Sequence, residues 1–367
     1  MNNKETYKVL GVMSGTSLDG LDLAFCTFEK EGDDNWQYEI SEAITLPYSD
    51  DWKEKLVSVE TASALDFVKA DWQLGNYIGD RIREFLIEHK ITPDFIASHG
   101  HTIFHQPDKY QIENSFTAQI GNGACIATRT SCTTINDFRI TDVALGGEGA
   151  PLVPIGDDLL FSEFDYCLNL GGIANISANK DFKRLAFDVC ACNMALNYLA
   201  REKGMEFDYN GEMAAEGNFK KDLFEAINQL DFFKTQGPKS LGKEWYLAEV
   251  LPLLKRFPYD VQDIAHTFVH HIAYQLKQTC DYLANEKQEK QKMLITGGGA
   301  HHQFLIQTLK QYIPNVELHI PDKTLIEFKE ALIFAFLGVL RWKGEVNTLA
   351  SVTGAKKDSI GGAIHLS

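Results

Sequence analysis

The chain has 367 residues, of which 44% are hydrophobic and 23% charged, so it is long enough for two globular domains with cores of their own. Its formal net charge of −16 argues against binding to nucleic acid or to an anionic membrane surface, because both attract basic proteins. Residues 1–8 are too polar for a secretion signal, and the apolar segment 331–339 is too short to span a bilayer. Seven scattered cysteines without framework spacing fit a reducing compartment. We therefore expect a cytoplasmic protein that binds neither nucleic acid nor membranes.

Two strand-like segments open the chain. Residues 7–12 and 21–28 alternate apolar with polar or small side chains, which is the period-two pattern of a β-strand. The segment between them, residues 13–20, reads Met-Ser-Gly-Thr-Ser-Leu-Asp-Gly. It is not a Walker loop, because no Gly-Lys-Ser/Thr follows and the next element is a strand rather than a helix. The pattern predicts a hairpin with a polar loop.

This first loop has the composition of a phosphate-binding loop. Its glycines and hydroxyl residues are Ser14, Gly15, Thr16, Ser17 and Gly20. Glycine lets backbone N–H groups approach a phosphate closely, and hydroxyl groups donate hydrogen bonds to it. Asp19 could hold a magnesium ion through water. The alternative is an ordinary hairpin turn, although a two-residue turn would need only Asp19 and Gly20.

The rest of the first half alternates strands and helices. Residues 36–45 and 95–97 are strand-like, and residues 65–89 carry apolar side chains at helical spacing. A polar, glycine-bearing stretch at 137–154 then separates the two halves. It is either a surface linker or a functional crossover, and its length favours the crossover, because long structureless loops are uncommon inside compact domains.

The second half repeats the opening pattern. Strand-like residues 165–170 and 173–177 flank Gly171 and Gly172. A strand at 185–187, a helix at 193–201 and an insert of undefined structure at 204–244 follow.

A third glycine loop lies near the end of the chain. A helix is expected at 262–285 and a strand at 293–296, after which Gly297, Gly298 and Gly299 precede helices at 303–312 and 325–343. A glycine turn between a strand and a helix N-terminus could face an anion. Together the three loops predict a duplicated nucleotide-binding architecture.

A series of uncommon motifs covers nearly the whole chain, from about residue 9 to 361. They read GVMSGTSLDG, SHGHTIFHQP, QIGNGACIA, DFRITDVALGGEGAPLVP, LNLGGIANIS, PKSLGKEW, ITGGGAHH, KEALIFAFLG and SVTGA. In order and spacing this series resembles the anhydro-N-acetylmuramic acid kinase family, which belongs to the actin, sugar-kinase and heat-shock-protein ATPase superfamily. The resemblance implies an α/β, two-domain actin-like ATPase (ribonuclease H-like) fold with a cleft between the domains. The implied domains are 1–140 plus 345–367, and 141–344 with an insert near 204–244.

The same resemblance implies a reaction and its participants. Family members hydrolyse the 1,6-anhydro ring of anhydro-N-acetylmuramic acid and phosphorylate O6, using ATP with Mg²⁺, in cell-wall recycling. Such a reaction needs one carboxylate as a base for water, and the family's aspartate corresponds to Asp188. Without the resemblance, Asp188 could also be a strand-end residue that caps the helix at 193. The implied ATP contacts are Gly15, Thr16, Ser17, Leu18, Asp19, Gly20, Leu21, Asp22, Gly171, Gly172, Gly297, Gly298 and Gly299.

Four further residues are implied substrate contacts: Arg139, Asp142, Asn193 and Glu330. Arg139 would suit the lactyl carboxylate of a muramic substrate, because a guanidinium binds a carboxylate through two parallel hydrogen bonds. Glu330 could also be an ordinary helix-surface charge. The resemblance further implies a homodimer, for which the helix from Gln262 is a candidate surface.

The sequence departs from the family after Asp188, which leaves two other functions open. Val189-Cys190-Ala191-Cys192-Asn193 stands where Thr-Gly-Pro-Gly-Asn is usual, so an ATP-binding degenerate paralogue or a kinase for a different amino sugar is the first alternative. The second is a metal-dependent transferase on the same fold, because His99, His101 and His105 have a spacing that can share an ion. His99 and His105 belong to the kinase pattern in any case, so only His101 favours the metal.

Overall fold

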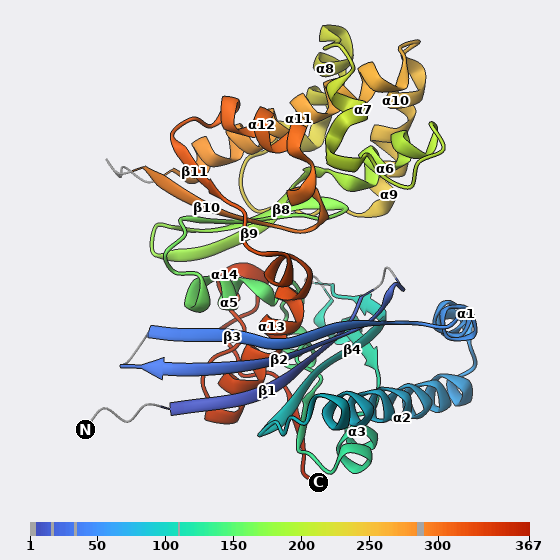
Figure 1. The fold of residues 1–367 in the computed structure, drawn as a ribbon, viewed down its shortest axis with the longest axis vertical. Coiled ribbons are helices and arrows are strands. Elements are labelled where there is room, and N and C mark those ends of the chain that lie inside the picture. The colour runs from blue at the N-terminus through green and yellow to red at the C-terminus, as the bar shows by residue number, and fades with distance from the viewer. Residues whose placement is uncertain (1–4, 16–17, 33–34, 109–110, 285–289) are drawn as a thin grey trace. The chain divides into compact units, whose positions relative to one another are not determined.

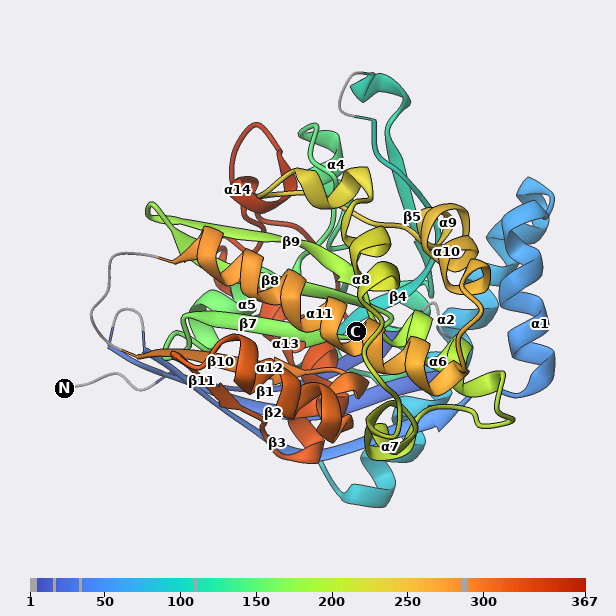
Figure 2. The ribbon, with the colours of Figure 1, turned by 90° about the horizontal axis from the view of Figure 1, so that it is seen from above.

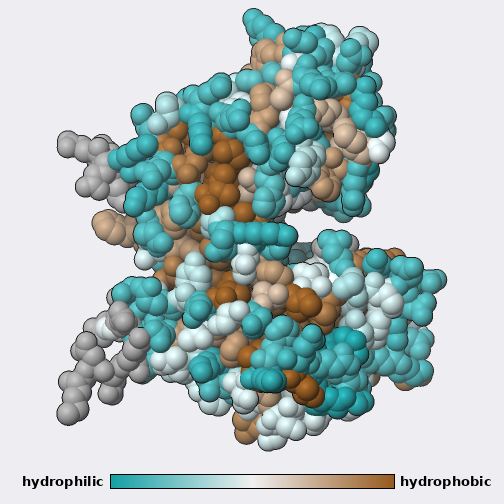
Figure 3. Space-filling model, viewed as in Figure 1, coloured by the Kyte–Doolittle hydropathy of each residue, from teal (hydrophilic) through white to brown (hydrophobic). Residues whose placement is uncertain are grey.

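A computed structural model describes residues 5–15, 18–32, 35–108, 111–284 and 290–367, which form two units (Figure 1). Unit 1 contains residues 1–160 and 328–367, and unit 2 contains residues 161–327. The predicted phosphate-loop residues Thr16 and Ser17 lie outside the described residues. Polar side chains cover most of the visible surface of each unit, which agrees with the high net charge (Figure 3).

Unit 1 is built on a mixed sheet with the order β12-β6-β4-β1-β2-β3, and β5 pairs with β4. Its strands are β1 (Glu5–Ser14), β2 (Gly20–Glu31), β3 (Asn35–Pro47), β4 (Phe95–Gln106), β5 (Phe116–Ile120), β6 (Thr134–Asn136) and β12 (Ala363–His365). The first three strands form an antiparallel meander, and β4 and β6 continue parallel to β1. The alternating pattern at 7–12 and 21–28 therefore gave the correct strands.

Helices cover both faces of this sheet. They are α1 (Asp50–Ser58), α2 (Ala64–His89), α3 (Gly123–Thr130), α4 (Ile140–Ala144), α5 (Val153–Leu160), α13 (Lys323–Lys343) and α14 (Ala350–Thr353), with 3₁₀ turns η1 (Val59–Thr61) and η2 (Ile112–Asn114). On one face, Leu10 and Val12 of β1 pack in a core with Leu74 and Ile78 of α2. On the other face α13 approaches so closely that a side chain at Gly11 would collide with its backbone.

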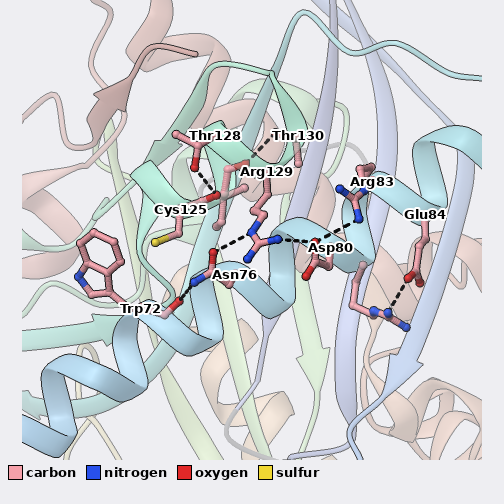
Figure 4. Close-up of polar contacts among 11 residues, drawn as sticks. Trp72, Asn76, Asp80, Arg83, Glu84, Cys125, Thr128, Arg129 and Thr130 are labelled. Carbon is pink, nitrogen blue, oxygen red and sulfur yellow. Dashed lines mark hydrogen bonds and ion pairs between the residues drawn. The ribbon is translucent and has the colours of Figure 1, made fainter.

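Helices α2 and α3 touch through two glycines. A Cβ at Gly75 or Gly79 would lie within 3 Å of Asn122 or Arg129, so both positions need a residue without a side chain. The guanidinium of Arg129 then donates to Asn76 and forms an ion pair with Asp80 (Figure 4). Small residues at the contact and polar pairs at its edge fix the position of α3 against α2.

Unit 2 repeats the strand arrangement of unit 1. Its sheet has the order β11-β10-β7-β8-β9, with an antiparallel β7-β8-β9 meander and β10 and β11 parallel to β7. Its strands are β7 (Tyr166–Leu170), β8 (Ile173–Lys180), β9 (Lys183–Ala191), β10 (Gln291–Thr296) and β11 (Val316–His319). Two copies of the order 3-2-1-4-5 with an antiparallel second strand make up the duplicated ribonuclease H-like arrangement, so the predicted fold class is confirmed.

The helices of unit 2 lie over its sheet and beyond it (Figure 2). They are α6 (Asn193–Arg201), α7 (Glu212–Ala215), α8 (Lys221–Asn228), α9 (Lys243–Trp245), α10 (Leu251–Arg256), α11 (Val261–Leu283) and α12 (Gln303–Tyr312), with short turns η3 (Tyr209–Gly211), η4 (Asp231–Lys234), η5 (Tyr246–Val250) and η6 (Gly298–His301). The insert predicted at 204–244 thus contains short helices joined by loops, and Leu223 and Ile227 anchor it in the core of unit 2.

The borders between the two units differ from the expected domain borders. They fall after residues 160 and 327, not after 140 and 344. The reason is that α5 and most of α13 belong to unit 1, where Lys329 of α13 pairs with Asp157 of α5. Asp281 is the one exposed residue of helix α11, the expected dimer surface, and the dimer stays a prediction. No helix among the described residues is long and apolar enough to cross a membrane.

The β8–β9 hairpin carries a strained turn. Asp181 and Phe182 have φ values of 50° and 61°, and the Phe182 ring is fully exposed. A left-handed conformation costs an ordinary residue about 1–2 kcal/mol, and glycine avoids this cost. The greater flexibility of glycine in the unfolded state cancels part of that gain. We expect Phe182→Gly to raise the free energy of unfolding by about 0.5–1 kcal/mol in urea titrations. Phe182→Ala keeps the strain and should show no gain; an equal gain in both variants would contradict the explanation.

Candidate functional site

Asp188 lies on β9, an edge strand of the unit 2 sheet, at a point where a bulge interrupts the strand. Asn175 pairs with Asp188 and Ala174 with Cys190, so Val189 is the extra residue. The bulge places both Val189 and Cys190 in the core while Asp188 stays half-buried. Bulges commonly re-aim a side chain beside an active site. The alternative role as a helix cap is excluded, because the α6 N-cap is Cys192 and no side chain caps it.

The Asp188 carboxylate is held by one oxygen. Its Oδ2 accepts a hydrogen bond from the Leu241 N–H at 2.7 Å and another from the Ser240 hydroxyl at 3.4 Å. Its Oδ1 accepts no hydrogen bond from the described residues. Burial raises the pKa of Asp188, and the two hydrogen bonds oppose this rise. A carboxylate with one fixed and one free oxygen and a raised pKa is suited to act as a general base.

The two glycine loops of unit 2 meet around Asn193. The carbonyls of Gly171 and Gly172 accept hydrogen bonds from the first N–H groups of α6, and the Asn193 amide donates to Leu170 O at 2.8 Å. Gly299 packs against the same Leu170 and Asn193, where a Cβ would be too close. The β7–β8 loop and the β10–η6 loop therefore form one assembly.

This assembly offers backbone donors to a ligand. Within the described part of the chain, the N–H groups of Gly171, Gly172 and Gly298 donate to no protein acceptor, and the last two residues are exposed. Free backbone N–H groups beside glycines are a typical cradle for phosphate oxygens. The N-terminus of α12 does not contribute as expected, because the His302 side chain caps it by accepting from Leu305 N–H.

The first loop supports only part of its predicted role. Gly15 and Leu18 are half-buried and Asp19 is exposed, so these residues are available to a ligand. The Leu21 side chain is fully buried in the core, and Gly20 is needed where β3 passes too close for a side chain. Only the backbone of these two residues could touch a nucleotide.

Two polar residues beside the first loop are occupied within the protein. The Ser14 hydroxyl is buried and hydrogen-bonded to Tyr48 and His101, so it is not a free phosphate donor. Asp22, one of the expected ATP contacts, accepts a hydrogen bond from Thr45 at 2.6 Å across the β2–β3 pair.

Arg139 is held by two of its three guanidinium nitrogens. Its Nε donates to His99 Nε2 at 2.9 Å, and its Nη1 donates to the Gly149 carbonyl at 2.7 Å. No described residue accepts from Nη2. Burial lowers the pKa of Arg139 to about 10, and nearby Glu330 opposes that shift. The side chain therefore remains a cation with one free donor edge.

The remaining predicted substrate residues differ in accessibility. Glu330 reaches solvent, yet enough protein surrounds it that desolvation raises its pKa. Asp142 is buried, and its two oxygens accept from Thr353 and from Gly149 N–H. A direct substrate contact by Asp142 stays a prediction; in this structure Asp142 holds the loop whose Gly149 carbonyl fixes Arg139.

The three histidines do not form a metal site. His99 uses both ring nitrogens, because Nδ1 donates to the Gly100 carbonyl and Nε2 accepts from Arg139. His101 bonds to Ser14, and His105 to Thr117. Among the described residues no group of histidine, cysteine or acidic side chains could hold a metal ion.

Sequence reasoning missed the residues that hold Asp188 and Arg139. Residues 239–241 and His99 lie far along the chain from the side chains they position. The PKSLGKEW motif was the available signal, since an uncommon motif inside an otherwise undefined insert points to a role outside packing.

A duplicated ribonuclease H-like fold with glycine loops and one well-placed carboxylate defines a phosphotransfer enzyme of the sugar-kinase class. The comparisons with known proteins agree. The family model for anhydro-N-acetylmuramic acid kinase matches residues 7–367. The anhydro-N-acetylmuramic acid kinase of Pseudomonas putida is 33% identical over 97% of this chain and 98% of its own. That of Sulfurovum sp. is 32% identical over 99% of this chain and 100% of its own. The chain therefore belongs to the anhydro-N-acetylmuramic acid kinase family, and the predicted family and enzyme class are confirmed.

Solved structures resemble the chain more distantly. A ROK family glucokinase from Streptomyces griseus, in complex with glucose and AMPPNP, covers 90% of this chain and 98% of its own at 9% identity and a TM-score of 0.37. The strand order of each unit, rather than this similarity, carries the fold assignment.

Proposed function

We propose that the protein uses ATP and water to open the 1,6-anhydro ring of anhydro-N-acetylmuramic acid and to phosphorylate O6, giving N-acetylmuramic acid 6-phosphate. The observation that carries the proposal is the Asp188 carboxylate, with Oδ2 fixed by the chain and Oδ1 free. Family membership over residues 7–367 supports the choice of sugar. In the cell this reaction would serve cell-wall recycling.

Asp188 is the general base of the proposed reaction. Its free Oδ1 takes a proton from the water that attacks the anomeric carbon, and the C1–O6 bond breaks. ATP supplies the γ-phosphoryl group that O6 then receives. Because Leu241 N–H and Ser240 fix the carboxylate, little orientational freedom is lost at the moment of proton transfer.

The exposed backbone around Gly171, Gly172 and Gly298 would hold nucleotide phosphates. Gly15 and Asp19 of the first loop are further proposed contacts. The exposed Asp19 carboxylate suits a magnesium ion that keeps its water shell. The Asn193 side-chain amide donates a hydrogen bond to the Leu170 carbonyl, so its proposed role is to hold the unit 2 loops together.

Arg139 and Glu330 are the proposed sugar contacts. A cation with a free edge would bind the lactyl carboxylate, and the exposed Glu330 carboxylate would accept from sugar hydroxyl groups. Asp142 supports Arg139 through Gly149.

The direct test is incubation of the purified protein with ATP, Mg²⁺ and the anhydrosugar, with the products followed by mass spectrometry. We expect a 6-phosphate product that carries one oxygen from solvent, which H₂¹⁸O labels. A parallel incubation with N-acetylglucosamine and N-acetylmuramic acid tests other amino sugars. Efficient transfer only to one of these would overturn the assigned substrate while keeping the kinase.

Arg139→Met should weaken sugar binding. A hydrogen bond to a charged group contributes about 1.5–3 kcal/mol, so we expect the KM for the anhydrosugar to rise by about 10- to 100-fold, with the KM for ATP unchanged. Steady-state kinetics against each substrate measure the two effects. The matched control is Arg129→Met, which removes a guanidinium from the surface of α3. An unchanged sugar KM in Arg139→Met would remove Arg139 from the binding site.

The alternative function is that of an ATP-binding protein that has lost the reaction. The altered sequence after Asp188 is the feature that favours this alternative. In the structure Cys190 and Cys192 are fully buried in the core of unit 2, so their thiols do not face a substrate. Nucleotide binding without transfer to any anhydrosugar would favour this alternative.

We also propose a cytoplasmic location and a homodimer. Seven free cysteines support a reducing compartment. The homodimer is a prediction from the family alone, and sedimentation velocity would test it.

A further inference from the structure

Residues 239–241, called the strap below, run beside Asp188 and contact it from both directions. The Asp188 N–H donates to the Lys239 carbonyl at 2.9 Å. In return the Leu241 N–H and the Ser240 hydroxyl donate to Asp188 Oδ2. Three hydrogen bonds therefore tie the strap to the backbone and the carboxylate of a single residue.

The Lys239 side chain connects the strap to the loop that precedes it in the chain. Its ammonium donates to the carbonyls of Phe232 at 3.0 Å and Thr235 at 2.7 Å. It also lies 4.2 Å from the centroid of the Phe232 ring, a distance typical of a cation–π contact. A lysine that folds back on two carbonyls of one loop fixes that loop's shape.

Packing alone does not support this loop. Thr235, Gln236, Gly237 and Lys239 line an open pocket of about 100 Å³, together with Phe187 and residues of α11. Phe232 and Phe233 pack on Trp245 at the start of this loop, whereas the two hydrogen bonds of Lys239 hold the part that borders the pocket. Loss of these bonds would let the strap move away from Asp188.

We propose that the strap is a positioning element for the general base, which Lys239 locks in place so that Asp188 keeps Oδ2 bound and Oδ1 free. This inference rests on the proposed function, since it assigns a role within that reaction. Cys190 is a titratable group that interacts with both Lys239 and Asp188. Burial holds the pKa of Cys190 well above its ordinary value, so it stays a neutral thiol. Hydrogen bonds to Oδ2 favour the ionised base, and without them its pKa would rise further.

The test compares the pH dependence of kcat/KM for the wild type and Lys239→Met, using ATP and the anhydrosugar. The variant keeps the apolar stem and removes the three donors. We expect kcat to fall by about tenfold or more, and the acidic limb of the profile to move up by about one pH unit, because a lost hydrogen bond to a charged group is of that size. Lys239→Arg donates to the same carbonyls and should restore most of both.

Two controls separate a positioning role from a general effect on folding. Lys234→Met removes an exposed lysine of the same loop, which pairs with Asp231, and should leave kcat and the profile unchanged. Calorimetry should show unchanged ATP binding in Lys239→Met. A variant with lower thermal stability but an unmoved acidic limb would overturn the strap's role. A wild type without activity toward any anhydrosugar would instead overturn the proposed function.

Discussion

Replacement of Asp188 by asparagine should lower kcat by at least about a hundredfold while nucleotide binding is retained. Asparagine has nearly the same shape, and its carbonyl oxygen can accept from Leu241 N–H as Oδ2 does. Its amide cannot take a proton from water, and general-base catalysis typically contributes 10²–10⁴ in rate. Steady-state kinetics measure the loss, and calorimetry with ATP shows whether the nucleotide site survives.

The matched control is Asp181→Asn, which makes the same charge change at the tip of the β8–β9 hairpin. Asparagine tolerates the left-handed φ of 50° at that position, so turnover should stay unchanged. The wild-type kcat/KM should fall as the pH drops through the folded pKa of Asp188, which burial raises above 3.8. This acidic limb should vanish from the residual activity of Asp188→Asn. Retained turnover in that variant would leave the reaction without its assigned base.

Local patterns predicted the elements on which the site depends. The period-two runs before and after Gly171 and Gly172 became β7 and β8, and the helical spacing after Ser63 became α2. These patterns are readable because each strand or helix buries one face in a core. The family resemblance then identified Asp188, which periodicity alone could not separate from a helix cap.

Contacts between distant residues account for what the sequence did not predict. Strands β6 and β12 have three residues each, too few for a periodic pattern. The partner that occupies one oxygen of Asp142, Thr353, lies 211 residues away. The loop motif predicts a nucleotide contact for Leu21, yet strand alternation directs its side chain into the core. A sequence motif predicts which segment lies at the site, whereas burial determines which side chains of that segment can reach a ligand.

Lys329→Met should destabilise unit 1 by about 3–5 kcal/mol. Lys329 Nζ lies 2.7 Å from Asp157 Oδ1, and both side chains are over nine-tenths buried between α13 and α5. Methionine fills a similar volume but leaves the Asp157 carboxylate buried without that charge, and breaking a buried ion pair from one side has this cost. Urea unfolding at pH 7, followed by circular dichroism, measures the loss.

Two comparisons make this stability prediction specific to the pair. Lys323→Met removes the exposed partner of Glu327 from the start of the same helix and should change stability by less than about 0.5 kcal/mol. The double variant Asp157→Asn, Lys329→Met removes both charges and should recover part of the loss. A double variant that is no more stable than Lys329→Met would mean that lost packing, not the buried Asp157 charge, destabilises the single variant.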